Sequence, residues 1–284
     1  MAELTTQRKI ALAQGRRSII MCGRRVLGAG DRAQVRRGGI AWDLDLREGI
    51  DFAIFLLGGF ELRTLRLYRQ LIQPGATVLD IGANIGAHTL PFADIVGSAG
   101  RVVAFEPTQF AYTKLQRNLE LNPRLRERVT TLQMALVDSS TAQVPEQIYS
   151  SWPLDSEEGL HAVHRGRLRG TQGAQAATLD DVMQSLELDR VDFIKLDVDG
   201  HEPEVLCGAS RTLARFHPKI LLEWAPYLFV AHSSKLESAL MILRESGYRA
   251  EVVGSHATQE VHCDSRAALV TAGASVNLLL RRGV

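Results

Sequence analysis

This chain of 284 residues is poor in the features that usually narrow a protein's class at once. It has only three cysteines, Cys22, Cys207 and Cys263, and their spacing fits neither a disulfide framework nor a metal-binding cluster. The odd count and the lack of a secretory leader favour a reducing compartment. No apolar run approaches the roughly 20 residues of a membrane span. We therefore expect a cytoplasmic protein with no membrane partner.

The chain also has little net charge and few aromatic residues. Its formal charge is +1 and aromatic residues make up 6% of it, so a basic platform interleaved with aromatics, as nucleic-acid binding would require, is missing. Arginine is dense within the first forty residues, which indicates either a solvated face or contact with an anionic partner. With 45% apolar and 23% charged residues, the composition is that of an ordinary globular protein.

From residue 76 onward, strand and helix patterns alternate at the spacing of βαβ units. This predicts an α/β fold with a mostly parallel sheet of seven strands and helices on both of its faces. The last two strands are joined by a long connection, which suits an antiparallel edge strand. The predicted strands are 76–81, 101–106, 129–135, 191–198, 219–224, 248–253 and 275–281. The predicted helices are 61–73, 86–95, 108–121, one opening at 178–181, 202–215 and 233–246.

Two segments depart from this rhythm. Residues 1–58 form a lead-in that we expect to contain short β elements, because residues 40–46 alternate between apolar and polar side chains. A helix is predicted near residues 5–14, and residues 59–284 form the main domain. Residues 139–177 make a connection that is long for a compact α/β protein, which favours a lid that binds the acceptor substrate, with a disordered insertion as the alternative.

The most informative stretch is Val78–Gly86. It is an apolar strand that ends in Asp80 and continues into a glycine turn, and a second strand ends in Glu106, twenty residues after Gly86. An acid at that distance is the usual partner of ribose hydroxyls in a nucleotide-binding βαβ unit.

The glycine spacing speaks to the kind of nucleotide. The pattern is D-x-G-x-N-x-G, with Asn84 where a dinucleotide fingerprint needs the glycine that admits a pyrophosphate. S-adenosylmethionine has no phosphate and needs an acid near its ammonium (Asp80), close backbone (Gly82) and a ribose acid (Glu106). The stretch therefore favours S-adenosylmethionine over a nicotinamide dinucleotide.

Six motifs together resemble the FkbM family of S-adenosylmethionine-dependent methyltransferases. They occur in the family's order and spacing over residues 59–224, whereas the first fifty residues and the 139–177 loop match less clearly. One departure is Asp199, which stands where the family usually has glutamate. The motifs are Gly59-Phe60-Glu61, Val78–Gly86, Val103-Ala104-Phe105-Glu106-Pro107, Met134-Ala135-Leu136-Val137-Asp138, Thr178-Leu179-Asp180-Asp181 and Asp192–Glu202.

The resemblance implies a Rossmann-like class I methyltransferase fold and O-methylation of a small-molecule or glycan acceptor. It places Asp80, Gly82 and Asn84 against the methionine end of the cofactor, with Glu61 approaching from the preceding segment. Glu106 would hold the ribose, and residues 135–138 would flank the adenine. The cofactor-binding residues predicted in this way are Glu61, Asp80, Gly82, Ala83, Asn84, Gly86, Glu106, Pro107, Ala135, Leu136, Asp138 and Asp197.

An alcohol is a poor nucleophile until its proton is removed, so a base or a metal is expected near the acceptor. One reading makes His201 or Asp197 the general base. Another has Asp197, Asp199 and Glu223 hold Mg²⁺, which prefers hard oxygen ligands. A third leaves positioning of the reactants as the whole of catalysis.

Other functions stay open at this point. An RNA methyltransferase of the same fold would show a salt-sensitive affinity for RNA. A nicotinamide-dependent dehydrogenase would prefer the dinucleotide to S-adenosylmethionine, and a binding module would hold the cofactor without transferring its methyl group. A homo-oligomer is compatible with the composition.

Overall fold

The computed structural model describes residues 6–155, 158–161, 165–225, 227–229, 233–253, 260–261 and 275–283. At its centre lies one sheet with the strand order β13-β12-β14-β11-β10-β3-β4-β5. The five neighbours from β11 to β5 run parallel, which confirms the predicted mostly parallel α/β sheet. The eight strands of the sheet are β3 (Thr77–Ile81), β4 (Arg101–Phe105), β5 (Val129–Leu132), β10 (Phe193–Leu196), β11 (Lys219–Trp224), β12 (Tyr248–Val252), β13 (Glu260–Val261) and β14 (Val276–Arg282).

The antiparallel part of the sheet differs in detail from the prediction. The edge strand β13 is antiparallel to β12 and pairs over only two residues. A second antiparallel strand, β14, lies further inside, between β11 and β12. Two strands therefore run opposite to the others: β14 inside the sheet and β13 at its edge.

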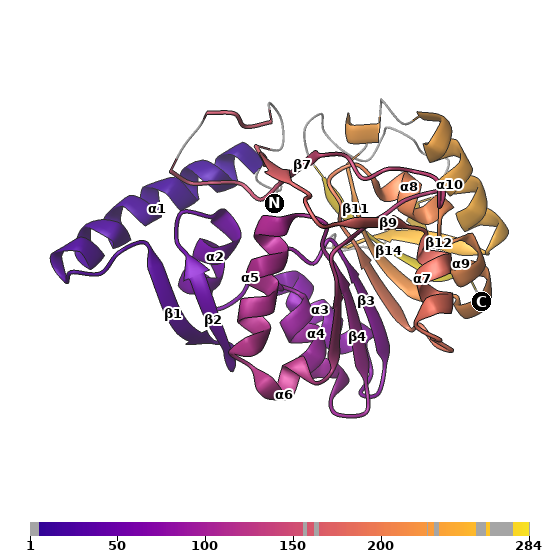
Figure 1. Cartoon of the computed structure of the whole chain (residues 1–284), viewed down its shortest axis with the longest axis horizontal. Helices are drawn as coiled ribbons and strands as arrows, with labels where there is room; N and C mark the ends of the chain where they lie inside the picture. Colours follow the sequence, from indigo (N-terminus) through magenta and orange to yellow (C-terminus); the bar gives the residue numbers. More distant parts are fainter. Residues whose placement is uncertain are drawn as a thin grey trace.

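Helices cover both faces of the sheet (Figure 1). Successive residues of β3 alternate between them: Val78 joins a core with α3 and α4, and Leu79 joins a core with α7 to α10. This alternation is the period-two pattern of a strand buried on both faces. The helices of the main domain are α3 (Leu62–Leu71), α4 (Thr89–Val96), α5 (Gln109–Glu120), α6 (Pro123–Arg126), α7 (Leu179–Ser185), α8 (Glu202–Cys207), α9 (Ser210–Phe216) and α10 (Ser233–Glu245).

The lead-in is more helical than its sequence predicts. Figure 1 shows it at one end of the molecule, with α5 between it and the sheet. The run 50–57 is a helix, and the helix expected near 5–14 is longer than predicted. The lead-in consists of α1 (Thr6–Val26), β1 (Arg32–Arg37), β2 (Ile40–Asp45) and α2 (Gly49–Leu57).

Two asparagines of the α5–α6 region complete the open edge of β2. Asn122 accepts a hydrogen bond from the Ala41 amide at 2.9 Å and donates one to its carbonyl oxygen at 2.7 Å. Asn118 accepts from the Asp43 amide at 2.9 Å and donates to the Ile85 carbonyl oxygen, also at 2.9 Å. These side chains satisfy backbone groups that an edge strand otherwise leaves unpaired. The lead-in is thereby bonded to the helix beside the glycine turn.

The described part of the 139–177 segment contains an antiparallel hairpin. Its strands are β7 (Gln147–Ser150) and β8 (Arg167–Gly170), and β9 (Gln175–Ala177) then pairs in parallel with β6 (Met134–Leu136). The expected strand 129–135 is thus split, because the chain leaves the central sheet at Gln133 to form this second pairing.

Two findings bear on the expectations from composition. In the described residues, no helix is long and apolar enough to cross a membrane. Cys22 and Cys207 are free thiols, and Cys263 lies outside the described residues.

Candidate functional site

The glycine turn after β3 bonds closely to the neighbouring strand. The amides of Gly82 and Ala83 both donate to the carbonyl oxygen of Phe105, at 3.0 and 2.9 Å. Gly82 has a φ of 85°, and a Cβ there would lie 1.8 Å from the carbonyl oxygen of Asp197. Only glycine lets this turn pass the end of β10, so the two strand ends meet where the sheet order changes direction. Such a switch point is where open α/β sheets bind ligands.

Glu106 and Asn84 are joined in this turn. The Glu106 carboxylate accepts from the Asn84 amide and the Thr108 amide, both at 2.9 Å, and from the Thr108 hydroxyl. Glu106 is 3% exposed, and burial raises the pKa of its carboxyl although these hydrogen bonds lower it. The predicted ribose acid is therefore held in one position by the backbone that surrounds it.

Asp80 is fully buried, and its nearest charge is Lys195. The two residues are direct neighbours on adjacent parallel strands, and their side chains share one face of the sheet. Asp80 Oδ1 lies 3.9 Å from Lys195 Nζ, and Asp80 Oδ2 accepts a hydrogen bond from the Thr89 hydroxyl. Burial raises the pKa of Asp80, whereas Lys195 lowers it. Lys195 is therefore an ion-pair partner of the enclosed Asp80.

The turn after β10 carries the accessible carboxyls. Asp197 Oδ2 lies 3.0 Å from Lys195 Nζ, and its side chain is 34% exposed. Burial raises the pKa of Asp197, but Lys195 and a hydrogen bond with Glu223 outweigh it and hold the pKa below its ordinary value. Glu223 shifts the other way, because burial and the charge of Asp197 raise its pKa. The two carboxyls of this pair thus shift in opposite directions.

Asp199 lies exposed in the same turn with a left-handed φ of 52°. The crowding of protein atoms and the Asp197 charge raise the pKa of Asp199. These same acids also reach Tyr227, since burial and then the charges of Glu223 and Asp199 raise the pKa of its hydroxyl to about 12. Tyr227 thus belongs to this end of the sheet.

Glu202, although part of the same motif, serves as scaffold. Its buried carboxylate accepts from the amides of Val198 at 2.9 Å and Gly200 at 3.0 Å. Burial raises the pKa of Glu202 to about 8, against the effect of those hydrogen bonds. His201 sits half-buried at the start of α8, on the turn that Glu202 holds. The turn thereby fixes the backbone from which His201 extends.

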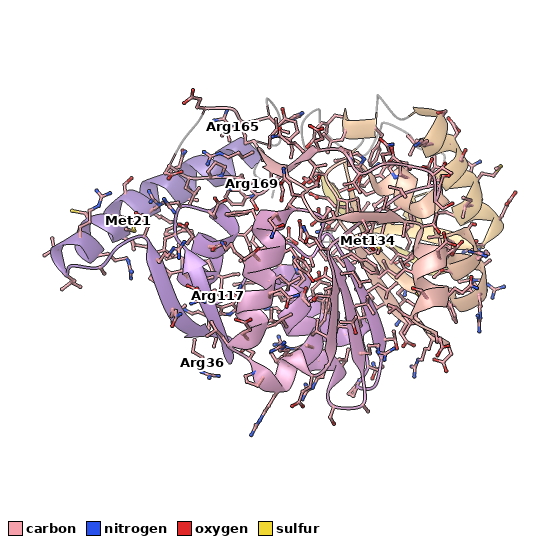
Figure 2. The ribbon with its side chains drawn as sticks, viewed as in Figure 1. Met21, Arg36, Arg117, Met134, Arg165 and Arg169 are labelled. Carbon is pink, nitrogen blue, oxygen red and sulfur yellow. The ribbon has the colours of Figure 1, made fainter. Side chains whose placement is uncertain are left out.

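The β7–β8 hairpin contacts the glycine turn from above. Asn84 Nδ2 lies 3.4 Å from the Ser150 hydroxyl and 3.1 Å from that of Ser151. On the other strand, Arg169 pairs with Glu48 at 2.7 Å and stacks 3.7 Å from the Phe110 ring. Figure 2 shows Arg169 near the end of α5, between the lead-in and the sheet. Sequence spacing carried no signal for these contacts, which join residues at least 59 positions apart.

The remaining predicted cofactor residues are spread around this site. Leu136 is buried in the core, and Ala135 beside it is half-buried. Asp138 pairs with Lys235 of α10 at 2.8 Å. Glu61 is exposed at the start of α3, and its charge acts on both Tyr68 and Lys195. Pro107 follows Glu106 and is half-buried.

Gly86 has a packing role. A Cβ at Gly86 would lie 2.5 Å from Leu90 and 2.8 Å from Leu115, so glycine is required for the contact between α4 and α5.

The predicted magnesium site does not form among the residues that the structure describes. In that part of the chain, no three His, Cys, Asp or Glu side chains come together in a way that could hold a metal ion. Glu223 instead bonds to Asp197 and accepts from the Ser275 hydroxyl, while Asp197 is tied to Lys195. Asp197 and Glu223 are thus engaged with protein partners, whereas Asp199 is exposed, and the three do not form a metal site.

The site does fit S-adenosylmethionine in its donor and acceptor groups. Two enclosed polar atoms, Asp80 Oδ1 and His88 Nε2, have no hydrogen-bond partner within the described ranges. Unpaired buried polar atoms are costly, and they gather at ligand sites. They lie next to an accessible acid, Asp197, which suits an ammonium group. Sequence reasoning had not singled out Tyr68, which holds His88, because nothing in its helical spacing distinguishes it from a core residue.

Three curated proteins that this chain resembles are named as methyltransferases. Among curated relatives, the hexuronic acid methyltransferase AglP of Haloferax volcanii is 27% identical over 153 residues, 54% of this chain and 58% of that protein. The methyltransferase sdnD of Sordaria araneosa is 30% identical over 175 residues, covering 52% and 66%. The 2-O-methyltransferase NoeI of Sinorhizobium fredii is 25% identical over 162 residues, covering 54% and 66%. The matches thus span less than two thirds of each of these relatives.

The matching protein family is described as the Methyltransferase FkbM domain, and it covers residues 80–250. That range runs from Asp80 through both acid-bearing turns to β12, and it makes up more than half of the chain. The expected family is confirmed: this chain belongs to the FkbM methyltransferase domain family.

Proposed function

We propose that this protein transfers a methyl group from S-adenosylmethionine to a hydroxyl of a small-molecule or sugar-containing acceptor. Membership of the family supports methyl transfer. Two relatives carry names that refer to a hexuronic acid and to 2-O-methylation, which supports an oxygen of a sugar-like molecule as the acceptor atom.

The observation that carries the proposal is the junction of the two turns at the sheet's switch point. Lys195 bridges Asp80 and Asp197, and the Gly82 turn passes within contact of the Asp197 backbone. A zwitterionic amino-acid group needs a carboxylate, a donor and close backbone. This junction provides all three, and Asp197 is its accessible carboxylate.

The roles of the acids follow from their burial. Asp197 is paired with Lys195 and has a lowered pKa, so it is a weak base and a good partner for the ammonium of the methionine moiety. Asp80 is enclosed, so it orients Lys195 and meets the ligand only through it. Glu106 and Asn84 form a rigid corner that suits the ribose.

When bound, S-adenosylmethionine supplies an electrophilic methyl group on a sulfonium. His201 is then the side chain best placed to accept the acceptor's hydroxyl proton, because histidine exchanges protons near neutral pH and α8 anchors it at the accessible turn. The β7–β8 hairpin covers the glycine turn and excludes water from that side. Tyr227, beside the acids, lines the acceptor side.

The direct test is transfer of a labelled methyl group from S-adenosylmethionine into a panel of hydroxylated acceptors, with uronic acids and their glycosides first. Thermal shifts with S-adenosylhomocysteine and with NADH separate this reading from that of a dehydrogenase. Label on an acceptor oxygen supports the proposal. A shift with NADH alone, or labelled RNA with no labelled small molecule, contradicts it.

A further inference from the structure

One buried side chain beside the cofactor site has an unused donor. His88, which caps the start of α4, is 5% exposed, and its Nδ1 lies 3.1 Å from the Tyr68 hydroxyl. Its other ring nitrogen, Nε2, is enclosed and has no hydrogen-bond partner in the described part of the chain. An enclosed nitrogen without a partner costs free energy that a ligand can recover.

The hydroxyl of Tyr68 decides which nitrogen of His88 carries the hydrogen. Tyr68 is 0% exposed, and within the described residues its hydroxyl forms a hydrogen bond with Nδ1 of His88. A buried hydroxyl hydrogen needs an acceptor, so Nδ1 accepts it and the ring hydrogen resides on Nε2. Burial lowers the pKa of His88 to about 3, so the ring is neutral and Nε2–H is a fixed donor.

The surroundings of His88 define what this donor can meet. The rings of Phe60, Tyr68 and Phe92 lie around the imidazole, with centroids 5.8, 5.6 and 6.4 Å away. The charges that act on it are those of Lys195 and Asp197, at the junction of the two turns. The ring therefore faces aromatic walls and the cofactor junction.

An anionic group fits this direction. His88 lies at the N-terminus of α4, where the helix dipole favours negative charge. The neighbouring Lys195 ammonium adds positive charge. Of the three rings, Tyr68 and Phe92 are completely enclosed, whereas Phe60 is half-buried and follows Gly58 and Gly59. Phe60 is thus the ring of the three that reaches the surface.

We propose that His88 donates its Nε2 hydrogen to the carboxylate of the cofactor's methionine moiety, and that Tyr68 positions it for this contact. The inference rests on the proposed function, because it assumes an S-adenosyl ligand at the junction. His88 then selects cofactors that carry the amino-acid group, complementing Asp197, which holds the ammonium at the opposite side.

Two ligands isolate this contact. S-adenosylhomocysteine carries the amino-acid group, and 5′-methylthioadenosine has the same nucleoside and sulfur without it. Binding of both is measured by calorimetry for the parent chain and for two amide variants. In His88→Asn the amide corresponds to Nδ1 and the Nε2 donor is lost, whereas in His88→Gln the amide nitrogen falls near Nε2.

The expected result is a loss of selectivity in one variant. His88→Asn weakens S-adenosylhomocysteine about tenfold, the value of a hydrogen bond to a charged group, and changes 5′-methylthioadenosine by less than about twofold. His88→Gln keeps most of the preference. Tyr68→Phe removes the hydroxyl that fixes the His88 tautomer, and it gives a smaller loss of affinity for S-adenosylhomocysteine. Thermal unfolding of each variant establishes that it is folded.

Two outcomes overturn the inference while the proposed function stands: unchanged selectivity in His88→Asn, or an equal loss for both ligands, as a purely structural role would give. If the parent chain binds neither nucleoside, the proposed function fails and the inference fails with it. Binding of both nucleosides by the parent with no preference between them also overturns the inference.

Discussion

The turn after β3 and the turn after β10 lie side by side, carry similar acids, and use them in opposite ways. At the first, Asp80 in β3 and Glu106 after the adjacent β4 are enclosed. Backbone amides and the Thr108 hydroxyl hold Glu106, and the Thr89 hydroxyl holds Asp80, with Lys195 3.9 Å away. In the second, Asp197 and Asp199 reach solvent, and only Glu202 is spent on the backbone. The acids at the first turn are thus enclosed by the protein, whereas those of the second turn are accessible to a ligand.

The difference shows that acids at two neighbouring strand ends can have different roles. Lys195 pairs with Asp80 of β3 and with Asp197 in the turn after β10. Asp80 therefore helps to hold the lysine whose charge lowers the pKa of Asp197. The rigid turn suits the ribose of the proposed cofactor, whereas the accessible turn can serve both the cofactor's ammonium, through Asp197, and the acceptor. Separate changes to each turn and to the lysine that joins them can test this division.

The largest effect is expected from removing the shared lysine. Lys195→Met leaves the enclosed Asp80 without its counter-charge, and breaking a buried pair in this way costs about 3–5 kcal/mol in the free energy of unfolding. Urea denaturation at neutral pH measures the loss. The double variant Lys195→Met/Asp80→Leu is the control and should recover much of it. A single variant as stable as the parent would contradict the pairing.

The next effect separates two roles within the turn after β10. His201→Gln should lower methyl transfer by about 10²-fold or more, because it removes the proposed base, while S-adenosylhomocysteine still binds. Asp197→Asn should weaken S-adenosylhomocysteine as well, because it takes the carboxylate from the ammonium. Rates and affinities of both variants are compared. If His201→Gln loses affinity and rate together, the proposed division of roles between His201 and Asp197 is wrong.

Stability should depend on pH through Glu202. Its pKa of about 8 in the folded chain exceeds the value near 4.3 of an exposed glutamate, so the folded state binds the proton more tightly. Stability from this group is therefore present at low pH and is lost as pH rises from about 4 to 8. Glu202→Gln should flatten this fall in thermal unfolding experiments.

A matched control for this measurement is Glu127→Gln, since Glu127 is an exposed glutamate far from the turn. It should leave the slope unchanged. Asp51, whose pKa burial raises to about 6, keeps part of the slope in every variant. An unaltered slope in Glu202→Gln would show that its carboxyl is not the group responsible.

The smallest effect concerns the cover of the closed turn. Ser151→Ala removes two hydrogen bonds with Asn84 and should cost about 0.5–1.5 kcal/mol, seen as a few-fold weaker binding of S-adenosylhomocysteine. Ser150→Ala, whose contact with Asn84 is longer at 3.4 Å, should cost less. Equal effects, or none, would separate the hairpin from cofactor binding.

Much of the fold could be predicted from sequence because the central strands are buried on both faces and read as apolar runs. Strand β1 was missed because Arg32–Arg37 is too polar to resemble a strand alone. The helix expected at 202–215 breaks near Gly208, where a Cβ would lie 2.1 Å from the Val137 carbonyl oxygen. Such breaks depend on distant backbone and leave no local trace.

The site was predictable in position but not in state. The acids follow strand ends, so their gathering at one edge of the sheet could be foreseen. Whether each would be enclosed could not, because Asp80 is shielded by a cross-strand neighbour and Glu223 by its hydrogen bond to Asp197. The same holds for the orphan nitrogen of His88, which depends on Tyr68, twenty residues earlier in the chain.

The ion pair between Arg169 and Glu48 matters for the design of shortened forms of this protein. The family match begins at residue 80, yet the hairpin inside it is fastened to residues 46–49 by that ion pair and by hydrogen bonds between Leu154 and Arg47 and between Gly49 and Trp152. A chain cut at residue 80 would lose the anchor of the hairpin that covers its own glycine turn. The smallest unit that keeps this anchor must therefore begin before Arg47.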